Sequence, residues 1–345
     1  MGQDCGNFNI FYIVRFSPKT LAKEKKRTMN FSVVGSQFWQ LLLNGLAVGL
    51  IYVLISLGYT MVYGVLRLIN FANSEIFMIG TFATVIVTER ILHYTSAHDA
   101  LHGVHLILVL LLLLVVSMVF SATTALFVEL VAYRRLRAKG TNRLASLISA
   151  IGTSIMLSEG VRILTKSAPV PTPRLLTKFN LFVFHGVALR VDTAMVIIGA
   201  LTLYILVDRF VSKTLLGKAI RAVSMSEDTS KLMGINLNRV ISATFVVGGL
   251  VTGAAAFFYM QVYETTVFNV GFNLGLAAFT AAVLGGIGNI RGAFFGGLTL
   301  GLFEEFASAV IGGQWKSVTV FVVLVLVLLV RPNGLFGEAI SQSRV

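Results

Sequence analysis

The ionisable residues that interrupt long apolar runs are the first candidates for chemistry in this sequence. They are Glu75, Glu159, Arg162, Glu304 and Glu305. Charged side chains at membrane depth are rare and often mark ion pathways or proton relays. A proton- or sodium-coupled carrier would need such groups paired near the midplane. Several of them lie within a turn or two of a predicted helix end, where a local ion pair suffices, so the pattern permits this hypothesis without favouring it.

The remaining nucleophiles and bases do not form an enzyme site. Ser154, inside a predicted span, would need a neighbouring base to act as a nucleophile. The five histidines lie in or beside predicted external loops instead: His93, His98, His102, His105 and His185. Three of them have the i, i+4, i+7 spacing of a zinc or copper site on a helix, but a polar external loop needs no metal to explain them. The sequence therefore predicts no catalytic residue, no metal site and no cofactor.

The sequence also lacks the phosphate-binding loop of ATPases. Its only Gly-Lys pair, Gly217-Lys218, has neither the upstream glycine nor the following Ser or Thr of that motif. If ATP drives transport through this chain, a separate chain must hydrolyse the ATP. We therefore expect a transport subunit that is not itself an enzyme.

The elements that position these residues must be membrane helices. Hydrophobic residues make up 56 % of the 345 residues and charged residues 12 %, about half the charged share of a globular domain. The net charge of +13 would suggest nucleic acid in a soluble protein, but in a membrane protein Lys and Arg fix the cytoplasmic loops. The single cysteine excludes an internal disulfide. The composition predicts an all-α polytopic protein of the lipid bilayer that binds no nucleic acid.

Hydrophobic runs of spanning length predict about eight or nine transmembrane or re-entrant helices. The runs are 38–62, 70–90, 104–130, 144–164, 193–212, 239–262, 276–311 (two crossings joined by a tight turn) and 317–330. The segment 165–192 holds three of the five prolines and is expected to be an extended external connection. We divide the chain into an N-terminal extension at 1–28, a transmembrane domain at 29–338 and a tail at 339–345.

Two basic loops set the orientation of the predicted helices. One holds five basic residues between Arg134 and Arg143, and the other is the loop 213–239. Two spans separate these loops, so both lie on one side, which the positive-inside rule makes the cytoplasm. The same parity puts the basic arm 19–27 outside. This conflict means either that the first region holds an extra re-entrant piece, or that the extension is an annotation artefact rather than native chain.

Glycines recur at four-residue spacing in several predicted spans. The sets are Gly45 and Gly49, Gly249 and Gly253, Gly288, Gly292 and Gly296, and Gly297 and Gly301. Small residues at this spacing let helix backbones approach closely in a membrane. The denser run Gly285-Gly286-Ile287-Gly288 exceeds what packing needs and suggests a broken helix that lines a cavity.

A set of ordered motifs identifies a family that this sequence resembles. The motifs are Asn44-Gly45-Leu46, Gly58 to Gly64, Ile69 to Ala72, Met78-Ile79-Gly80, Val131 to Arg134, Leu147 to Gly152, Ser154-Ile155, Gly217, Arg221-Ala222, Glu227-Asp228, Gly234-Ile235-Asn236, Arg239-Val240 and Phe279 to Gly288. Over about residues 36–337 the chain resembles the permease subunits of bacterial ABC importers for branched-chain amino acids, above all the H-type Liv subunit. Members of this family normally begin near Met29.

The resemblance implies the ABC importer permease fold and a half-transporter of the bacterial inner membrane. It further implies a second permease of the M type, two cytoplasmic ATPase subunits and a periplasmic solute-binding protein as partners, which agrees with the missing phosphate-binding loop. The chain departs from the family at Asn73-Ser74, where a His-Gly pair is usual before the glutamate. This departure leaves the solute open between branched-chain amino acids and urea, short amides or other amino acids.

We expect two segments to line the translocation path, because each combines polar or glycine-rich backbone with flanking spans. The candidate residues are Asn70, Phe71, Asn73, Glu75, Gly285, Gly286, Gly288 and Asn289. The alternative is that both segments are tight packing contacts.

We expect the loop 213–239 to couple this chain to an ATPase. The stretch from Glu227 to Ile235 predicts a short helix with acids in its first turn and Gly234 at the C′ position. It resembles the EAA-type coupling loop of importer permeases, in which a small residue precedes the glycine by four. The candidate residues are Glu227, Asp228, Ser230, Leu232, Met233, Gly234 and Ile235. The alternative is a solvated basic loop that only fixes topology.

Overall fold

The structure is a computed structural model that describes residues 34–35, 37–94, 103–138, 143–176, 179–184, 187–331 and 333–337. The proposed extension at 1–28 and the tail at 339–345 lie outside these residues, as do His98, His102 and His185. Among the described residues, no three His, Cys, Asp or Glu side chains group as metal ligands.

Helices make up most of the described chain. The helices of membrane-spanning length are α3 (Phe38–Leu66), α5 (Gly103–Val128), α7 (Arg143–Thr165), α8 (Val191–Lys213), α11 (Leu237–Tyr263), α13 (Ile290–Ile311) and α14 (Lys316–Val330), the last of which η3 extends to 18 residues. The shorter ones are α4 (Asn73–Ile86), α6 (Arg134–Ala138), α9 (Leu215–Met225), α10 (Glu227–Leu232) and α12 (Val270–Gly285), with η1 (Val87–Ile91), η2 (Glu129–Tyr133) and η3 (Gly313–Trp315). Seven helices of the described part are long and apolar enough to cross a membrane. The predicted all-α polytopic fold is confirmed.

Two of the predicted crossings differ from the expectation. The run 70–90 becomes α4, which has 14 residues and is continued by the five-residue π-helix η1. The run 276–311 does form two helices joined by a tight turn, but the first of them, α12, already begins at Val270. Both α4 and α12 are therefore shorter than α3, the long helix that both of them contact.

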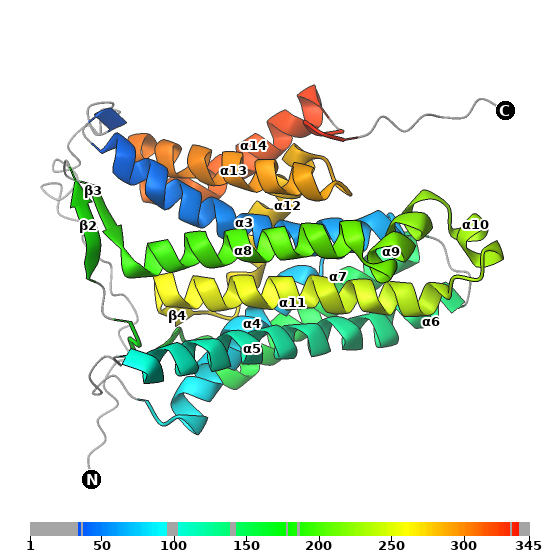
Figure 1. Cartoon of the computed structure of the whole chain (residues 1–345), viewed down its shortest axis with the longest axis horizontal. Helices are drawn as coiled ribbons and strands as arrows, with labels where there is room; N and C mark the ends of the chain where they lie inside the picture. The colour runs from blue at the N-terminus through cyan, green and yellow to red at the C-terminus, as the bar shows by residue number, and fades with distance from the viewer. Residues whose placement is uncertain are drawn as a thin grey trace, which may run out of the picture.

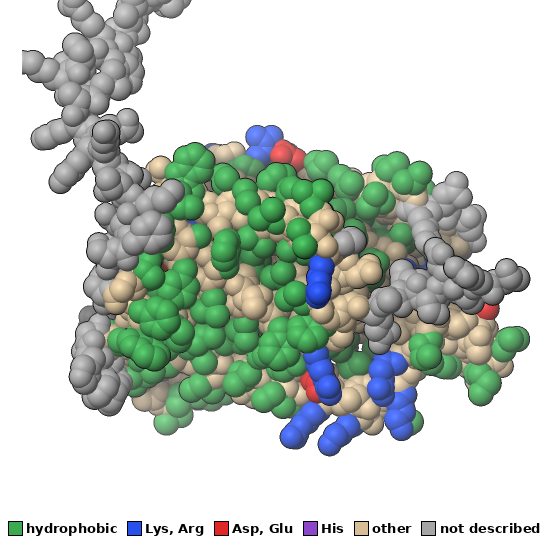
Figure 2. All heavy atoms as spheres, turned by 90° about the horizontal axis from the view of Figure 1, so that it is seen from above, with side chains coloured by type: hydrophobic (Ala, Val, Ile, Leu, Met, Phe, Trp, Pro, Cys, Tyr) green, Lys and Arg blue, Asp and Glu red, His purple; other side chains and the backbone are tan. Residues whose placement is uncertain are grey.

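The loops collect at two opposite ends of the helix bundle. Helices α6, α9 and α10 lie at one end, which we call the basic end, and strands β2 (Asn180–Phe184) and β3 (Val187–Arg190) lie at the other, the hairpin end (Figure 1). The two basic loops thus share one end, as their sequence spacing predicted. On the face seen in Figure 2, hydrophobic side chains cover a broad area and Lys and Arg gather toward the basic end.

Short strands pair the connecting segments with one another at the hairpin end. Strands β2 and β3 form an antiparallel hairpin within the segment 165–192. Strand β1 (Val170–Pro171) pairs antiparallel with β4 (Thr265–Thr266), which follows α11. These pairs give the backbone groups of the connections hydrogen-bond partners where no helix supplies them.

Glycine contacts hold the centre of the bundle together. A methyl group on Gly301 of α13 would lie 2.8 Å from the Gly45 carbonyl oxygen of α3. A methyl group on Gly253 of α11 would lie 2.5 Å from the Ser117 carbonyl oxygen of α5. Because side chains at these positions would separate the backbones, the four-residue glycine spacing acts here as a helix-packing device.

Helix α7 packs more loosely than its neighbours. A methyl group on Gly152 or Gly160 would have no heavy atom within 4 Å, and Leu164 is 83 % exposed. A cavity of about 700 Å³ with mostly apolar walls separates α7 from α4, η1 and α5. This helix therefore presents much of its surface to whatever surrounds the chain.

The glycine contacts predict that changing glycine to alanine has opposite effects on stability at Gly301 and at Gly160. Gly301→Ala should lower the stability of the purified chain by about 1–3 kcal/mol, because the added methyl group overpacks the contact between α3 and α13. Gly160→Ala should leave the stability unchanged or raise it slightly, because its methyl group meets open space and alanine favours the helix. Thermal unfolding in detergent measures both, and equal melting temperatures would contradict the packing role of Gly301.

Candidate translocation and coupling sites

Helix α4 begins inside the bundle rather than at its surface. Helix α3 ends at Leu66, and Arg67 takes a left-handed conformation with φ of 50°. The chain then turns inward, so that the Asn73 side chain lies within hydrogen-bonding distance of Thr252 Oγ1, 3.4 Å away. Thr252 lies near the middle of α11. The first residues of α4 are therefore at about half the depth of the long helices.

Asn70 holds the inward turn in place. Its side chain is buried, and its Oδ1 atom accepts a hydrogen bond from the Ala72 backbone N–H at 3.1 Å. The same atom accepts a second hydrogen bond from the Tyr133 hydroxyl at 3.0 Å. One side chain thus satisfies a backbone donor at the start of α4 and connects this turn to η2.

Helix α12 also begins at this depth, beside the start of α4. A methyl group on Gly271 would lie 2.8 Å from Glu75 Oε2, and one on Gly275 would lie 3.1 Å from the Tyr59 hydroxyl. The first turns of α4 and α12 therefore meet at Ser74 and Glu75. Since each helix start carries partial positive charge from its free N–H groups, this junction favours a negative group.

Glu75 is the carboxylic acid at that junction, and it is only 1 % exposed. Its Oε1 atom accepts hydrogen bonds from Ser74 Oγ at 3.4 Å and from Ser154 Oγ of α7 at 3.3 Å. Its Oε2 atom is buried without a hydrogen-bond partner. Glu75 forms no ion pair with a described Lys or Arg, so the acid is balanced only by hydroxyl groups and helix ends. Glu75 thus retains one acceptor atom, Oε2, to which no described group donates.

Aromatic rings surround the same junction. The Phe71 ring centroid lies 6.0 Å from that of Phe279 on α12, which in turn lies 6.2 Å from the ring of Tyr59 on α3. These separations lie within the range of favourable aromatic pairs. Asn70, Phe71, Asn73 and Glu75, which are close in the sequence, all lie at this junction.

The second predicted segment, Gly285 to Asn289, lies elsewhere. It follows the 16 residues of α12, which span about 24 Å, and stands at the basic end. Gly286 has φ of 103°, and Asn289 Oδ1 caps α13 by accepting from the Gly292 N–H at 3.2 Å. The segment packs against the chain's own residues near Phe336, which accepts a hydrogen bond from Asn289 Nδ2. The structure does not bring this turn to the Glu75 junction.

Helix α10 forms the tip of the basic end. Its N-cap Ser226 accepts a hydrogen bond from the Thr229 N–H, and the acids Glu227 and Asp228 lie in its first turn. At its other end, Gly234 has φ of 81°, and the Ile235 N–H donates to the Ser230 carbonyl. This is a Schellman motif with glycine at C′, as the sequence predicted for this stretch.

The side chains of α10 divide into an inner and an outer set. Leu232 and Met233 are 88 % and 78 % exposed, whereas Ile235 is half-buried and Ser230 is buried against the rest of the chain. Leu232 and Met233 therefore form an exposed apolar pair at the end of a polar loop. The small residue Ser230 does not belong to that outer surface, in contrast to the expectation from its spacing to Gly234.

A residue that the sequence reasoning missed connects the two regions. Arg67 Nη2 donates to the Ser224 carbonyl at 3.0 Å and to the Met225 carbonyl at 3.4 Å, at the end of α9. A cavity of about 530 Å³ lies beside this contact and is lined by residues of α3, η2, α9 and α10, among them Arg67 and Tyr133. The inward turn before α4 is therefore anchored at the basic end by Arg67.

The other acids that interrupt apolar runs in the sequence differ from Glu75 in burial and in ion pairing. Glu159 and Arg162 form an ion pair at 2.5 Å on the exposed side of α7. Glu304 is buried on α13, and Glu305 beside it is paired with Lys316, which the sequence reasoning did not single out.

Comparison with known proteins assigns this arrangement to a family. The model of the family described as branched-chain amino acid transport system, permease component, matches residues 41–328, from the first turns of α3 to the last turns of α14. This chain belongs to that permease family. The motifs from Asn44 to Gly288 that suggested this family all lie inside the matched residues of the permease. The match also covers nearly all of the described helices.

Individual relatives agree with the family match. The permease is 39 % identical over 307 residues to the high-affinity branched-chain amino acid transport system permease protein BraD of Pseudomonas aeruginosa, covering 87 % of this chain and 96 % of the relative. It is 36 % identical over 305 residues to the permease protein LivH of the corresponding system of Escherichia coli, with the same coverage. The fructose import permease protein FrcC of Rhizobium meliloti is 26 % identical over 130 residues, 35 % of this chain. No solved structure matches the chain.

The inward turn predicts different effects for two asparagines. Asn70→Ala should lower the stability of the permease by about 1–3 kcal/mol, because it leaves a buried backbone N–H and the Tyr133 hydroxyl without their acceptor. Asn73→Ala should cost less, because both hydrogen bonds of Asn73 are long, at 3.4 Å. Thermal unfolding in detergent compares the two variants. A larger loss for Asn73→Ala would contradict the anchoring role of Asn70.

Proposed function

We propose that this permease moves branched-chain amino acids across the bacterial inner membrane as a subunit of an ATP-driven importer. The observation that supports the solute most strongly is the 39 % identity to a high-affinity branched-chain amino acid permease over 96 % of that relative. In this proposal a second permease completes the path, two cytoplasmic ATPase subunits supply energy, and a periplasmic binding protein delivers the solute. The basic end then faces the cytoplasm, in agreement with the positive-inside rule.

The junction of α4 and α12 is the proposed part of the path that touches the solute. Transporters often bind solutes at mid-depth, where interrupted helices direct their ends toward a polar group. Glu75, with its unpartnered Oε2 atom, provides such a group, and Asn70, Phe71 and Asn73 surround it. The turn from Gly285 to Asn289 stays a prediction for the inner end of the path.

The same junction suggests that selectivity lies mainly outside this chain. Within the described part of the chain, no Lys or Arg forms an ion pair with Glu75, so none is placed there to bind the carboxylate of an amino acid. A path that must release its solute should bind the solute weakly. We therefore expect the binding protein to choose the solute and the permease to set the rate of passage.

Glu75→Gln tests the path. Uptake of labelled leucine by cells that carry the complete importer should fall about tenfold, because the variant loses one charged hydrogen-bond acceptor. The order of preference among leucine, isoleucine and valine should stay the same. Glu159→Gln is the matched control and should change uptake less than about twofold, because its ion pair is half-exposed.

The same assay separates the competing functions. Uptake that requires the binding protein and is blocked by vanadate supports the importer, whereas uptake abolished by a protonophore with ATP intact would establish an ion-coupled carrier instead. A new order of preferred amino acids in Glu75→Gln would place selectivity in this chain. Uptake of urea or short amides without leucine uptake would replace the solute class.

We further propose that α10 docks on an ATPase subunit. Leu232 and Met233 supply an exposed apolar contact, and the Schellman motif at Gly234 fixes their direction. Through Arg67, which donates to the end of α9, a shift of α9 and α10 would reach the inward turn before α4. The cavity beside Arg67 leaves room for such a shift.

Met233→Glu tests the docking surface. The variant should insert into the membrane normally but lose ATPase association and uptake, because a carboxylate replaces an apolar side chain at the contact. Lys218→Gln, an exposed change on the same end of the molecule, should retain both. Co-purification of the ATPase with each variant measures the association. If Met233→Glu still retains the ATPase and transports at the normal rate, α10 is not the coupling element.

A further inference from the structure

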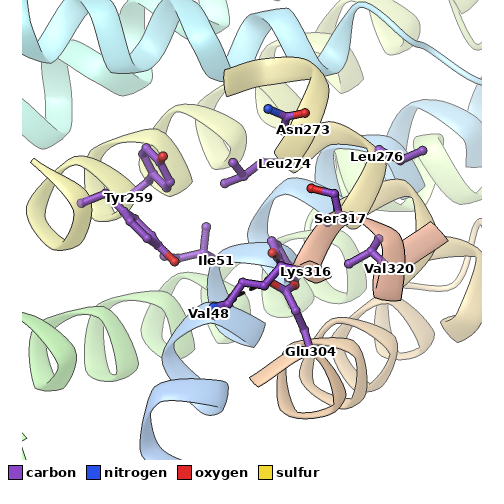
Figure 3. Close-up of a pocket in the computed structure, with 13 residues that line it drawn as sticks. Val48, Ile51, Tyr259, Asn273, Leu274, Leu276, Glu304, Lys316, Ser317 and Val320 are labelled. Atoms are coloured by element: carbon purple, nitrogen blue, oxygen red, sulfur yellow. Dashed lines mark hydrogen bonds and ion pairs between the residues drawn. The ribbon is translucent and has the colours of Figure 1, made fainter. Parts of the chain in front are cut away.

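A second polar site lies in the half of the permease toward the hairpin end. It is a cavity of about 200 Å³ between α3, α11, α12, α13 and α14 (Figure 3). Gly271 and Gly275, the α12 residues that face Glu75 and Tyr59, do not line it. Pockets for drug-sized ligands have about 300–1,000 Å³, so this cavity suits a smaller molecule. None of the residues proposed for the path or for coupling lines it.

One wall of the cavity carries charged groups. Glu304 is 4 % exposed, and its Oε2 atom accepts a hydrogen bond from the Tyr52 hydroxyl at 2.7 Å. Its Oε1 atom lies 4.0 Å from Lys316 Nζ, too far for a hydrogen bond. Lys316 Nζ instead lies 2.5 Å from Glu305 Oε1. Figure 3 shows Lys316 and Glu304 side by side at the base of the cavity.

The position of Lys316 leaves the Glu304 carboxyl group without a close cation. Two carboxyl groups, those of Glu304 and Glu305, share the single ammonium group of Lys316, and Glu305 has the short contact. Glu304 keeps a free acceptor atom, since no further hydrogen bond to its Oε1 is formed within the described residues. A buried carboxylate without a close cation is costly, so this wall favours an additional positive group.

The other walls match an alkyl chain with a cationic end. The rings of Tyr259 and Tyr263 are stacked with centroids 4.5 Å apart, and both residues line the cavity. Aromatic faces attract an ammonium group. The remaining lining is largely aliphatic: Val48, Ile51, Leu274, Leu276, Ala277 and Val320.

We propose that this cavity binds a small alkylammonium group, the amino end of an aliphatic amino acid, with Glu304 as the acceptor and the tyrosine pair beside it. The identification of the ligand as an amino acid rests on the proposed function, whereas the recognition of the ammonium group rests on the cavity alone. The cavity is a site separate from the Glu75 junction, because α12 lies between them.

Cysteine labelling tests the charge of the cavity. Ser317 lines the cavity and Gln314 does not, and both residues are exposed, so the two positions differ in their place relative to the cavity. Each is changed to cysteine in the full chain in lipid nanodiscs, with the only natural cysteine replaced (Cys5→Ser). A cationic methanethiosulfonate should label Ser317→Cys about tenfold faster than an anionic one, relative to Gln314→Cys. Adding Glu304→Gln should remove most of this preference.

Protection from labelling tests the ligand. Isopentylamine and leucine should slow the labelling of Ser317→Cys several-fold and leave Gln314→Cys unchanged, whereas 4-methylvalerate, which lacks the amino group, should protect neither. Because protection is measured without Glu304→Gln, the test holds even if that variant fails to fold. No protection by either amine would overturn the proposal, and so would protection by 4-methylvalerate, which would indicate an anion site at Lys316.

The outcomes also separate this inference from the proposed function. Protection by isopentylamine but not by leucine would keep the ammonium site and remove the amino acid as its ligand. Leucine uptake that is lost in the importer assay while isopentylamine still protects would overturn the proposed function alone. A preference for the cationic reagent without any protection would show a charged wall with no ligand site, which contradicts the proposal.

Discussion

Backbone hydrogen bonding inside a bilayer constrains everything else in this permease. Helices α4 and α12 begin at mid-depth, where water cannot supply acceptors for their first N–H groups. Local turns satisfy part of this need, as when the Glu75 N–H donates to the Ala72 carbonyl at 3.1 Å. Asn70 supplies an acceptor from its side chain. Without this local satisfaction, the polar junction around Glu75 could not exist at that depth.

The mid-depth junction in turn needs close helix packing around it. The glycine contacts between α3 and α13 and between α5 and α11 bring these helices together, and Gly271 gives α12 room beside Glu75. Small residues thus have two roles in this fold: they let long helices pack closely, and they leave space for the start of the shorter helix α12. The two polar regions, at Glu75 and at Glu304, are then separated by a single helix, α12.

The sequence predicted features that depend on neighbouring residues and missed those that depend on distant ones. Apolar runs predicted the spans, and the order of acids and glycine predicted α10 with Gly234 at its C′ position, because both signals are local. The start of α4 at mid-depth was not predictable, since the run 70–90 is long enough for a full crossing. Arg67 contacts α9 across 157 residues of sequence, and Tyr52 contacts Glu304. Neither contact could be predicted, because no residue pattern in one segment indicates its partner in the other. Gly285 to Asn289 has the glycine content of a broken helix, and in the fold it forms the turn between α12 and α13.

The loose packing of α7 makes this helix the one most dependent on its lipid surroundings. Apolar side chains line the cavity of about 700 Å³ beside it, which is partly open to the surroundings, so its walls suit acyl chains better than water. A helix that few protein contacts hold adjusts its tilt to the thickness of the hydrocarbon layer. Because Ser154 of α7 donates to Glu75, a change in acyl-chain length would alter the hydrogen bonding of the central acid. Membrane thickness thereby becomes a variable of the proposed solute path itself.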